Sequence, residues 1–218
     1  MNHNNSISNN ISKIQAYLFL FLINITTISC DQKNNEYFLD LNRQKIYHTH
    51  FLTERNDKFW TGDDGLQRAK ILNGEYHFKS SDTIPRFNAP FFIIKENENF
   101  EIETSLIASK NDPLKFYGLL MGTFNDGSVI AFQINDTGNI RIDHNKTFYE
   151  GNFNNNVAAF KKLTIRKVSG RIKFFLNEDL IYSYHFTHKL NNLRAGPITD
   201  VDLETSMDYI TIDKIITD

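Results

Sequence analysis

The carboxylates with the most suggestive spacing are Glu101 and Glu103, which lie in a segment where polar and apolar residues alternate. Residues two apart in a strand point to the same face and lie about 6–7 Å apart along it. Two carboxylates can act as general acid and nucleophile when they flank a bond about 5–5.5 Å apart. Ser105 follows on the same face, so the series has no third acid, and a solvated strand face explains both residues without any chemistry.

A second set of side chains could bind a ligand without reacting with it. Gln133 and Arg141 occupy polar positions on two neighbouring predicted strands, and Tyr149 follows them. Trp60, the only tryptophan, could stack on a sugar ring, although we expect it to be buried in the core. The candidate ligand-binding set is therefore Glu101, Glu103, Gln133, Arg141, Trp60 and Tyr149. Polar ligands need several converging groups, so the set requires a fold that brings its members together.

Alternation gives the four polar members of this set a common orientation. In each predicted strand the polar residue stands next to an apolar residue that we expect in the core: Ile102, Ile134 and Ile142. The polar residues should therefore point away from the core. If their strands belong to one sheet, all four would share one face.

Neither a metal nor another cofactor is expected. His48 and His50 share a strand face, but the sequence shows no third ligand. Asp63, Asp64 and Asp126 could contribute to a Ca²⁺ site, yet no D-x-D-x-D-G loop surrounds them, and turn chemistry explains the same residues.

The composition excludes several classes of protein. With a formal net charge of −2 and a pI of about 6.4, the chain lacks the basic field that binds nucleic acid. A single cysteine allows neither an internal disulfide nor a cysteine-based zinc site. The chain contains no G-x-S-x-G, H-E-x-x-H, P-loop or dinucleotide-binding motif. We therefore assign no catalytic residue.

The elements that must position the candidate residues are strands. Residues 163–186 are typical of three antiparallel strands, with turns at Ser169-Gly170 and at residues 177–179. Similar short strands recur through residues 46–218, while residues 190–200 are expected to form a loop. Gly118 and Gly122 fall on one strand face and should leave room for a large residue opposite. The sequence predicts an all-β domain, an antiparallel two-sheet jelly-roll sandwich over residues 46–218.

The N-terminal residues 1–29 are typical of a signal peptide. The apolar run at residues 16–28 is short for a membrane span but suits a signal-peptide core, and Ser29 precedes Cys30. This pattern resembles a bacterial lipoprotein signal, which implies a lipidated Cys30 and a polar tether over residues 30–45. An ordinary secretory signal and an uncleaved anchor are the alternatives. The lipoprotein interpretation places the protein in the bacterial cell envelope, anchored to the membrane, most simply the outer membrane, through Cys30.

Several stretches, in this order, resemble a known family: RNDKFWTGDDG, AKILNGEYHF, NFEIETSLI, FYGLLMGTFNDGSVIAFQINDTGNIRI, KKLTIRKVSGRIKFFLNEDLIYS and YITIDKI. They are similar to the concanavalin A-like, laminin-G-like β-sandwich domains of bacterial envelope proteins. Glu178-Asp179 depart from the pattern, because the family usually has Gly after Asn177. The segments NFNNNVAAF (residues 152–160) and LRAGPI (residues 193–198) also differ from the sequences usual in the family.

The resemblance implies a sandwich fold but several functions. Carbohydrate-binding modules, glycoside hydrolases and domains without an assigned ligand share this fold. Retaining hydrolases of this kind carry three alternating acids on one strand, whereas this chain has only Glu101 and Glu103. We expect a lipid-anchored, non-catalytic domain that binds a glycan or an envelope protein. The alternatives are a glycan-active hydrolase and a structural or assembly domain without a small ligand.

Overall fold

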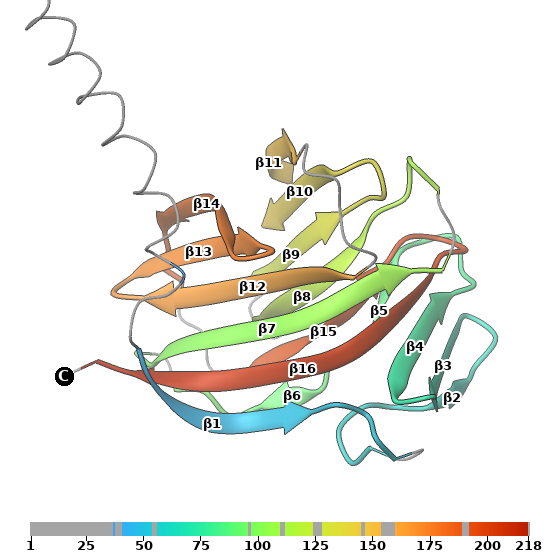
Figure 1. Cartoon of the computed structure of the whole chain (residues 1–218), viewed down its shortest axis with the longest axis horizontal. Helices are drawn as coiled ribbons and strands as arrows, with labels where there is room; N and C mark the ends of the chain where they lie inside the picture. The colour runs from blue at the N-terminus through green and yellow to red at the C-terminus, as the bar shows by residue number, and fades with distance from the viewer. Residues whose placement is uncertain are drawn as a thin grey trace, which may run out of the picture. The chain divides into compact units, whose positions relative to one another are not determined.

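The computed structural model describes residues 37, 41–53, 56–95, 97–109, 112–123, 128–144, 147–153, 160–188 and 192–217. The chain divides into two compact units, Met1–Leu39 and Asp40–Asp218. In the second unit the described residues form two antiparallel sheets and no helix (Figure 1). The predicted all-β, two-sheet sandwich is confirmed. Cys30 and the signal segment lie outside the described residues.

Sheet A crosses the front of Figure 1 and sheet B lies behind it. The order in sheet A is β14 (Asp179–His185), β13 (Arg171–Leu176), β12 (Lys161–Val168), β7 (Asn99–Ala108), β16 (Glu204–Ile216), β4 (Glu75–Ser80), β3 (Gln67–Leu72) and β2 (Gly62–Asp63), with β1 (Asn42–Thr49) also paired to β16. The order in sheet B is β11 (Thr147–Asn152), β10 (Asn139–His144), β9 (Ser128–Ile134), β8 (Tyr117–Thr123), β15 (Leu193–Thr199) and β5 (Arg86–Phe87), with β6 (Phe91–Phe92) also paired to β15.

The three-strand segment is folded as its sequence predicts. Strands β12, β13 and β14 follow one another, and the two tight turns between them have positive φ angles at both central residues. In the first turn these residues are Ser169 (φ 50°) and Gly170 (φ 72°). In the second they are Asn177 (φ 49°) and Glu178 (φ 74°), so a glutamate occupies a left-handed conformation that favours glycine.

The core lies between the two sheets and consists of alternate residues of each strand. Ile102, Ile134 and Ile142 are fully buried, as the sequence predicts. Phe174 of sheet A is also fully buried, and its ring contacts that of Phe132 of sheet B edge-on, with 5.4 Å between centroids. The partners of these residues in alternation therefore point outward, on one of two opposite faces of the sandwich.

The segment around residue 196 forms a strand, so the predicted loop over residues 190–200 is wrong. Strand β15 pairs with β8 from Arg194 to Thr199 and with β5 and β6 at its two ends. Pro197 has no N–H to donate, and it stands where the neighbouring edge is interrupted between β5 and β6. Gly196 is needed there, because an added Cβ would lie 2.0 Å from the Asn88 carbonyl oxygen. Gly196 and Pro197 therefore lie within a strand, opposite the interruption between β5 and β6, and do not form a loop.

Two smaller predictions are also corrected. An added Cβ at Gly118 would lie 2.0 Å from the Phe132 carbonyl oxygen, and one at Gly122 would lie 2.3 Å from that of Ser128. These glycines admit the backbone of the adjacent strand, not a large side chain opposite. Strand β1 begins at Asn42, within the expected tether, because residues before 46 pair with the end of β16.

Candidate functional site

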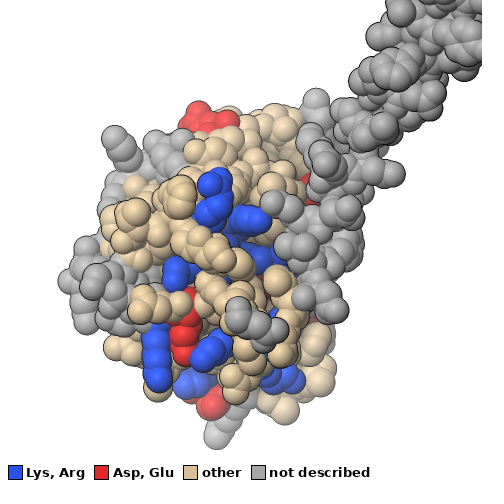
Figure 2. All heavy atoms as spheres, turned by 90° about the vertical axis from the view of Figure 1, so that its left-hand side faces the viewer, with Lys and Arg blue, Asp and Glu red and all other residues tan. Residues whose placement is uncertain are grey.

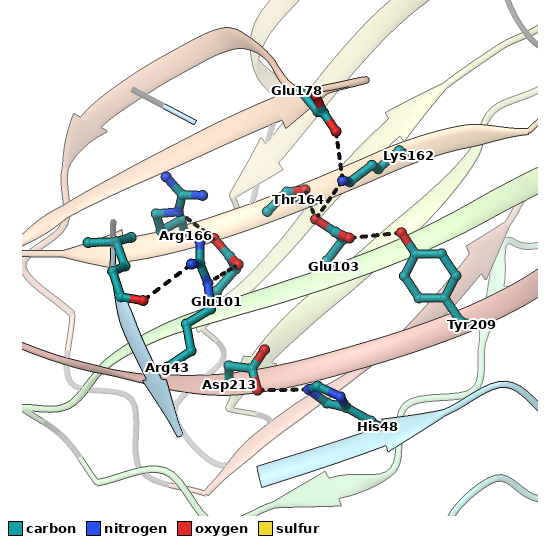
Figure 3. Close-up of polar contacts among 11 residues, drawn as sticks. Arg43, His48, Glu101, Glu103, Lys162, Thr164, Arg166, Glu178, Tyr209 and Asp213 are labelled. Atoms are coloured by element: carbon teal, nitrogen blue, oxygen red, sulfur yellow. Dashed lines mark hydrogen bonds and ion pairs between the residues drawn. The ribbon is translucent and has the colours of Figure 1, made fainter. Parts of the chain in front are cut away.

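Glu101 lies on the outward face of sheet A, where arginines from two other strands hold it. Its Oε1 accepts a hydrogen bond of 2.9 Å from Arg43 Nε on β1, and its Oε2 pairs with Arg166 of β12 (Figure 3). Arg166 is only 1% exposed, and its guanidinium also lies 4.8 Å from the centre of the Phe175 ring. The carboxylate therefore balances a buried cation, which makes it part of the fold.

Glu103 is engaged just as fully on the same face. It accepts hydrogen bonds from Thr164 Oγ1 at 3.1 Å and from the Tyr209 hydroxyl at 2.8 Å. Lys162 Nζ lies 3.3 Å from its Oε2 and bridges it to Glu178 (Figure 3). A general acid or nucleophile must be able to reach substrate, whereas both glutamates are surrounded by protein donors. Both carboxylates are therefore engaged in contacts within the fold.

The two histidines of the β1 region also serve local contacts. His48 Nε2 lies 2.8 Å from Asp213 Oδ1, and the His50 ring packs 5.6 Å from the Tyr209 ring. Among the described residues, no three His, Cys, Asp or Glu side chains come together as metal ligands.

Asp63 and Asp64 accept hydrogen bonds from backbone N–H groups of the turn that follows them. Hydrogen bonds from Gly65 and then Arg68 lower the pKa of Asp63, and those from Gln67 and Leu66 lower the pKa of Asp64. These aspartates stabilise a turn. Asp126 lies outside the described residues.

A second polar cluster lies on the outward face of sheet B. Gln133 of β9 and Arg141 of β10 are directly opposite one another, and Arg141 Nη2 donates a 2.9 Å hydrogen bond to Gln133 Oε1. Asp143, two residues further along β10, brings Oδ2 to 3.0 Å from Arg141 Nε. The guanidinium also stacks 4.5 Å from the centre of the Phe116 ring. We call Gln133, Arg141, Asp143 and Phe116 the β9–β10 cluster.

The β9–β10 cluster has hydrogen-bonding groups that the protein does not satisfy. Gln133 Nε2, Arg141 Nε and Asp143 Oδ1 are buried and have no hydrogen-bond partner; although Arg141 Nε is close to Asp143, its N–H is not directed at that oxygen. Gln133 is only 1% exposed. A buried polar atom without a partner costs about 1–3 kcal/mol, so folded proteins rarely keep several together. Among the described residues only four such atoms occur, and the fourth is Arg86 Nε.

The structure therefore separates the four polar residues that the sequence grouped. Glu101 and Glu103 belong to sheet A, whereas Gln133 and Arg141 belong to sheet B. All four point away from the core as alternation predicts, but on opposite sides of the sandwich. Only Gln133 and Arg141 meet.

Trp60 and Tyr149 lie apart from the β9–β10 cluster. Trp60 is 39% exposed and its indole covers Gly62, so the expected burial in the core is wrong. Its neighbour Phe59 is buried instead, since that side chain turns inward. Tyr149 is half-buried, and its ring lies 4.6 Å from the ring of Tyr182, which links the edge strands β11 and β14. Trp60 is therefore partly open to solvent, whereas Tyr149 serves packing.

Sequence reasoning missed two members of the cluster. Asp143 could have been found, because it stands at i+2 from Arg141 in the same predicted strand and so shares its face. Phe116 carries no such signal, since it precedes β8 and reaches Arg141 only through the pairing of β8, β9 and β10.

No protein-family model and no curated protein matches the sequence. Solved structures do match. The catalytic domain of an endo-1,3-beta-glucanase (laminarinase) from Thermotoga petrophila RKU-1 has a TM-score of 0.59 and 11% identity, over 81% of this chain and 100% of that chain. The fold is the concanavalin A-like jelly-roll sandwich.

Two further structures support this assignment of the fold. The Emp47p carbohydrate recognition domain gives a TM-score of 0.59 at 7% identity, over 80% of this chain and 97% of that chain. The laminarinase from Flavobacterium sp. UMI-01 gives a TM-score of 0.54 at 14% identity, over 80% of this chain and 100% of that chain. The predicted resemblance to concanavalin A-like domains is confirmed at the level of fold.

Proposed function

We propose that the sandwich binds a glycan on the outward face of sheet B and does not cleave it. The observation that carries the proposal is the group of three buried polar atoms without partners, on Gln133, Arg141 and Asp143. They offer two N–H donors and one carboxylate acceptor within one cluster. Sugar hydroxyls both donate and accept hydrogen bonds, so a glycan could satisfy all three. Because these atoms are buried in the structure, binding requires the side chains or segments that cover them to move aside.

The strand register extends this site into a row across sheet B. The successive partners in this row are Arg141 on β10, Gln133 on β9, Gly118 on β8, Ile198 on β15 and Phe87 on β5. Four strand spacings of about 4.8 Å make this row about 19 Å long. Polar groups stand at one end, no side chain rises at Gly118, and at the other end Phe87 is 37% exposed. Such a row suits an oligosaccharide, with hydrogen bonds at one end and ring stacking at the other.

The non-catalytic proposal is supported by the position of the carboxylates. Glu101 and Glu103 lie on the other sheet and are held by cations. On the sheet B face, Asp143 pairs with Arg141, and Glu150 of β11 lies opposite Arg141. These are the two carboxylates that a hydrolase on this face would use. The similarity to laminarinases concerns the fold, so cleavage remains an outcome to be tested.

We further propose that lipidated Cys30 anchors the sandwich to the membrane of a bacterial cell envelope, with the outer membrane as the simplest location. The support is the sequence pattern around residues 16–30. Within the described residues, no helix is long and apolar enough to cross a membrane. Radiolabelled palmitate should enter the wild-type protein and not Cys30→Ser. Equal labelling of the two would overturn the anchoring proposal.

A glycan array followed by a release assay on the full chain tests the binding proposal. We expect binding to at least one oligosaccharide, no released product, and loss of binding in Arg141→Met. Arg68→Met is the matched control, because Arg68 is an exposed arginine on β3 in sheet A. Release of sugar that disappears in Asp143→Asn would favour the hydrolase. No binding to any glycan would favour an envelope-protein partner or a structural role.

A further inference from the structure

The outward face of sheet B ends, at β6, in an edge that exposes large apolar side chains. Phe91 is 45% exposed and Ile93 is 76% exposed, whereas the residue that follows each of them is buried. This alternation turns Phe91, Ile93 and Lys95 to the same side. Arg194 of β15 lies opposite Phe91, and its guanidinium lies 5.6 Å from the centre of that ring. We call Phe91, Ile93, Lys95 and Arg194 the β6 patch.

The β6 patch is distinct from the proposed glycan site. None of its four residues belongs to the β9–β10 cluster or to the row of strand partners that ends at Phe87. Phe91 and Ile93 are two residues apart in an extended segment, so their side chains lie about 6–7 Å apart. Adjacent exposed apolar side chains of this size commonly mark a surface that contacts a protein or a membrane.

The form of this edge disfavours a β-strand of another chain as the partner. Strands β5 and β6 contain two residues each, and Pro90, which precedes β6, has no N–H to donate. The Pro90 carbonyl oxygen already accepts the Ala195 N–H at 3.2 Å. Short strands and proline protect an edge from pairing with another chain. A partner that needs no ladder of backbone hydrogen bonds therefore fits this edge better.

The composition of the β6 patch suits the interface of a lipid bilayer. Phe91 and Ile93 can enter the boundary of the acyl chains, and the long stems of Lys95 and Arg194 let their charged ends reach the phosphates. None of the four residues is acidic. The side of the sandwich where β1 begins is also basic, because Figure 2 shows more Lys and Arg than Asp and Glu on it. Anionic headgroups attract such a surface.

The length of the tether keeps the β6 patch within reach of a membrane that holds Cys30. Asn42, the first residue of β1, comes twelve residues after Cys30, and twelve residues span at most about 40 Å. Tyr47 lies roughly 17 Å further along β1. Its ring packs against that of Phe92 in β6, with 5.2 Å between centroids. This step rests on the proposed lipid anchor at Cys30.

We propose that the β6 patch docks the anchored sandwich onto the surface of the bilayer. Phe91 and Ile93 enter the interface, and Lys95 and Arg194 contact the headgroups. The β9–β10 cluster lies three and four strands away from β6 in sheet B, so it stays outside this contact.

The test uses the full chain carrying Cys30→Ser, which removes the only cysteine, so that one new cysteine can carry the environment-sensitive dye NBD. Ile93→Cys reports on the patch. Leu114→Cys is the matched control, because Leu114 is 83% exposed and precedes the end of β8 that is remote from Arg194. The labelled proteins are mixed with vesicles of phosphatidylcholine and phosphatidylglycerol, with and without spin-labelled acyl chains. Since the dye reports only its own position, vesicle binding by the apolar residues 16–28 does not produce the signal.

We expect the spin label to quench the dye at residue 93 at least threefold more than the dye at residue 114. Adding Phe91→Ser or Arg194→Gln to the Ile93→Cys protein should reduce that difference at least twofold. Arg171→Gln, at an exposed arginine of β13 in sheet A, is the control and should not. Equal quenching at the two positions, or none at residue 93, overturns the proposal. So does a blue shift at residue 93 that needs no vesicles and grows with protein concentration, because it shows a second copy covering the patch.

These outcomes are separate from those of the proposed function. Quenching at residue 93 together with equal palmitate labelling of wild type and Cys30→Ser would support the patch and overturn only the anchor. Palmitate labelling that depends on Cys30, without quenching at residue 93, would overturn only the docking. The glycan array reports on Arg141, which lies outside the patch.

Discussion

The outward faces of sheets A and B carry polar residues in the same alternating pattern, but the two faces differ in how completely the protein supplies hydrogen-bond and ion-pair partners for them. On sheet A, Glu101 and Glu103 are surrounded by Arg43, Arg166 and Lys162, together with hydroxyl donors. On sheet B, the β9–β10 cluster leaves three buried polar atoms without partners. Alternation identifies which residues point outward, but only the partners show whether a residue serves the fold or is available to a ligand.

This comparison changes what each face should do when it is mutated. A satisfied network stabilises the fold, so its disruption should lower stability and leave ligand binding unchanged. A cluster with unsatisfied atoms costs stability, so its removal should abolish binding and leave stability unchanged or improved. Stability and binding should therefore respond separately on the two faces.

The largest effect is expected in the core that supports both faces. Phe174 is fully buried against Phe132 of the other sheet, so Phe174→Ala should lower the free energy of unfolding by about 3–5 kcal/mol through lost burial and a new cavity. Urea denaturation measures the change. A loss below about 1 kcal/mol would mean that this ring does not join the two sheets.

The next largest effect belongs to sheet A. Glu101→Ala should lower the free energy of unfolding by about 3 kcal/mol, because it removes a carboxylate from Arg166, which is 1% exposed. Glu101→Gln is the control that keeps the size and one acceptor oxygen, and it should lose less. If Glu101→Ala were as stable as the wild type in urea, the network would not be structural and the contrast between the faces would fail.

On sheet B, a substitution in the β9–β10 cluster should weaken glycan binding strongly and change stability little. Gln133→Met removes the unpaired Nε2 at similar volume but also ends the hydrogen bond to Arg141. These effects oppose each other, so stability should change by less than about 1 kcal/mol. Binding to a glycan selected on the array should weaken at least tenfold. A destabilisation as large as that of Glu101→Ala would show that the two faces are alike.

The smallest effect is expected at the turn after β13, at the margin of the sheet A network. Glu178 has φ 74°, a conformation that costs a non-glycine residue about 1 kcal/mol. Its ion pair with Lys162 at 3.0 Å is half-exposed and contributes less than about 0.5 kcal/mol. Glu178→Gly should therefore raise the free energy of unfolding by about 0.5 kcal/mol. Asn177→Gly is the contrasting variant, and it should destabilise because Asn177 Oδ1 accepts the Lys162 N–H.

Much of the fold was predictable, because the sequence features that specify strands are local. Alternation and the turn at Ser169-Gly170 locate β12 and β13, and the burial of Ile102 and Ile134 follows from it. The strand over residues 193–199 was not predictable, because Gly196 and Pro197 normally indicate a turn. They fit a strand here only because the adjacent edge is interrupted, which is a property of the assembled sheet.

The candidate site was predictable only in part. Residue type and alternation selected Gln133 and Arg141, but they selected Glu101 and Glu103 by the same rule. Which strands share a sheet depends on contacts between distant segments, such as β7 with β12 and β16, which a single sequence does not show. Hydrogen-bond satisfaction, the feature that separates the two pairs, depends on those contacts as well.

The most direct test measures the affinity of one array-selected glycan for three proteins side by side: the wild type, Arg141→Met, and the double variant Glu101→Gln with Glu103→Gln. The affinity should fall at least tenfold in Arg141→Met and remain at the wild-type value in the double variant, provided that circular dichroism shows all three folded. Unchanged binding in Arg141→Met together with weakened binding in the double variant would place the site on sheet A and contradict the account.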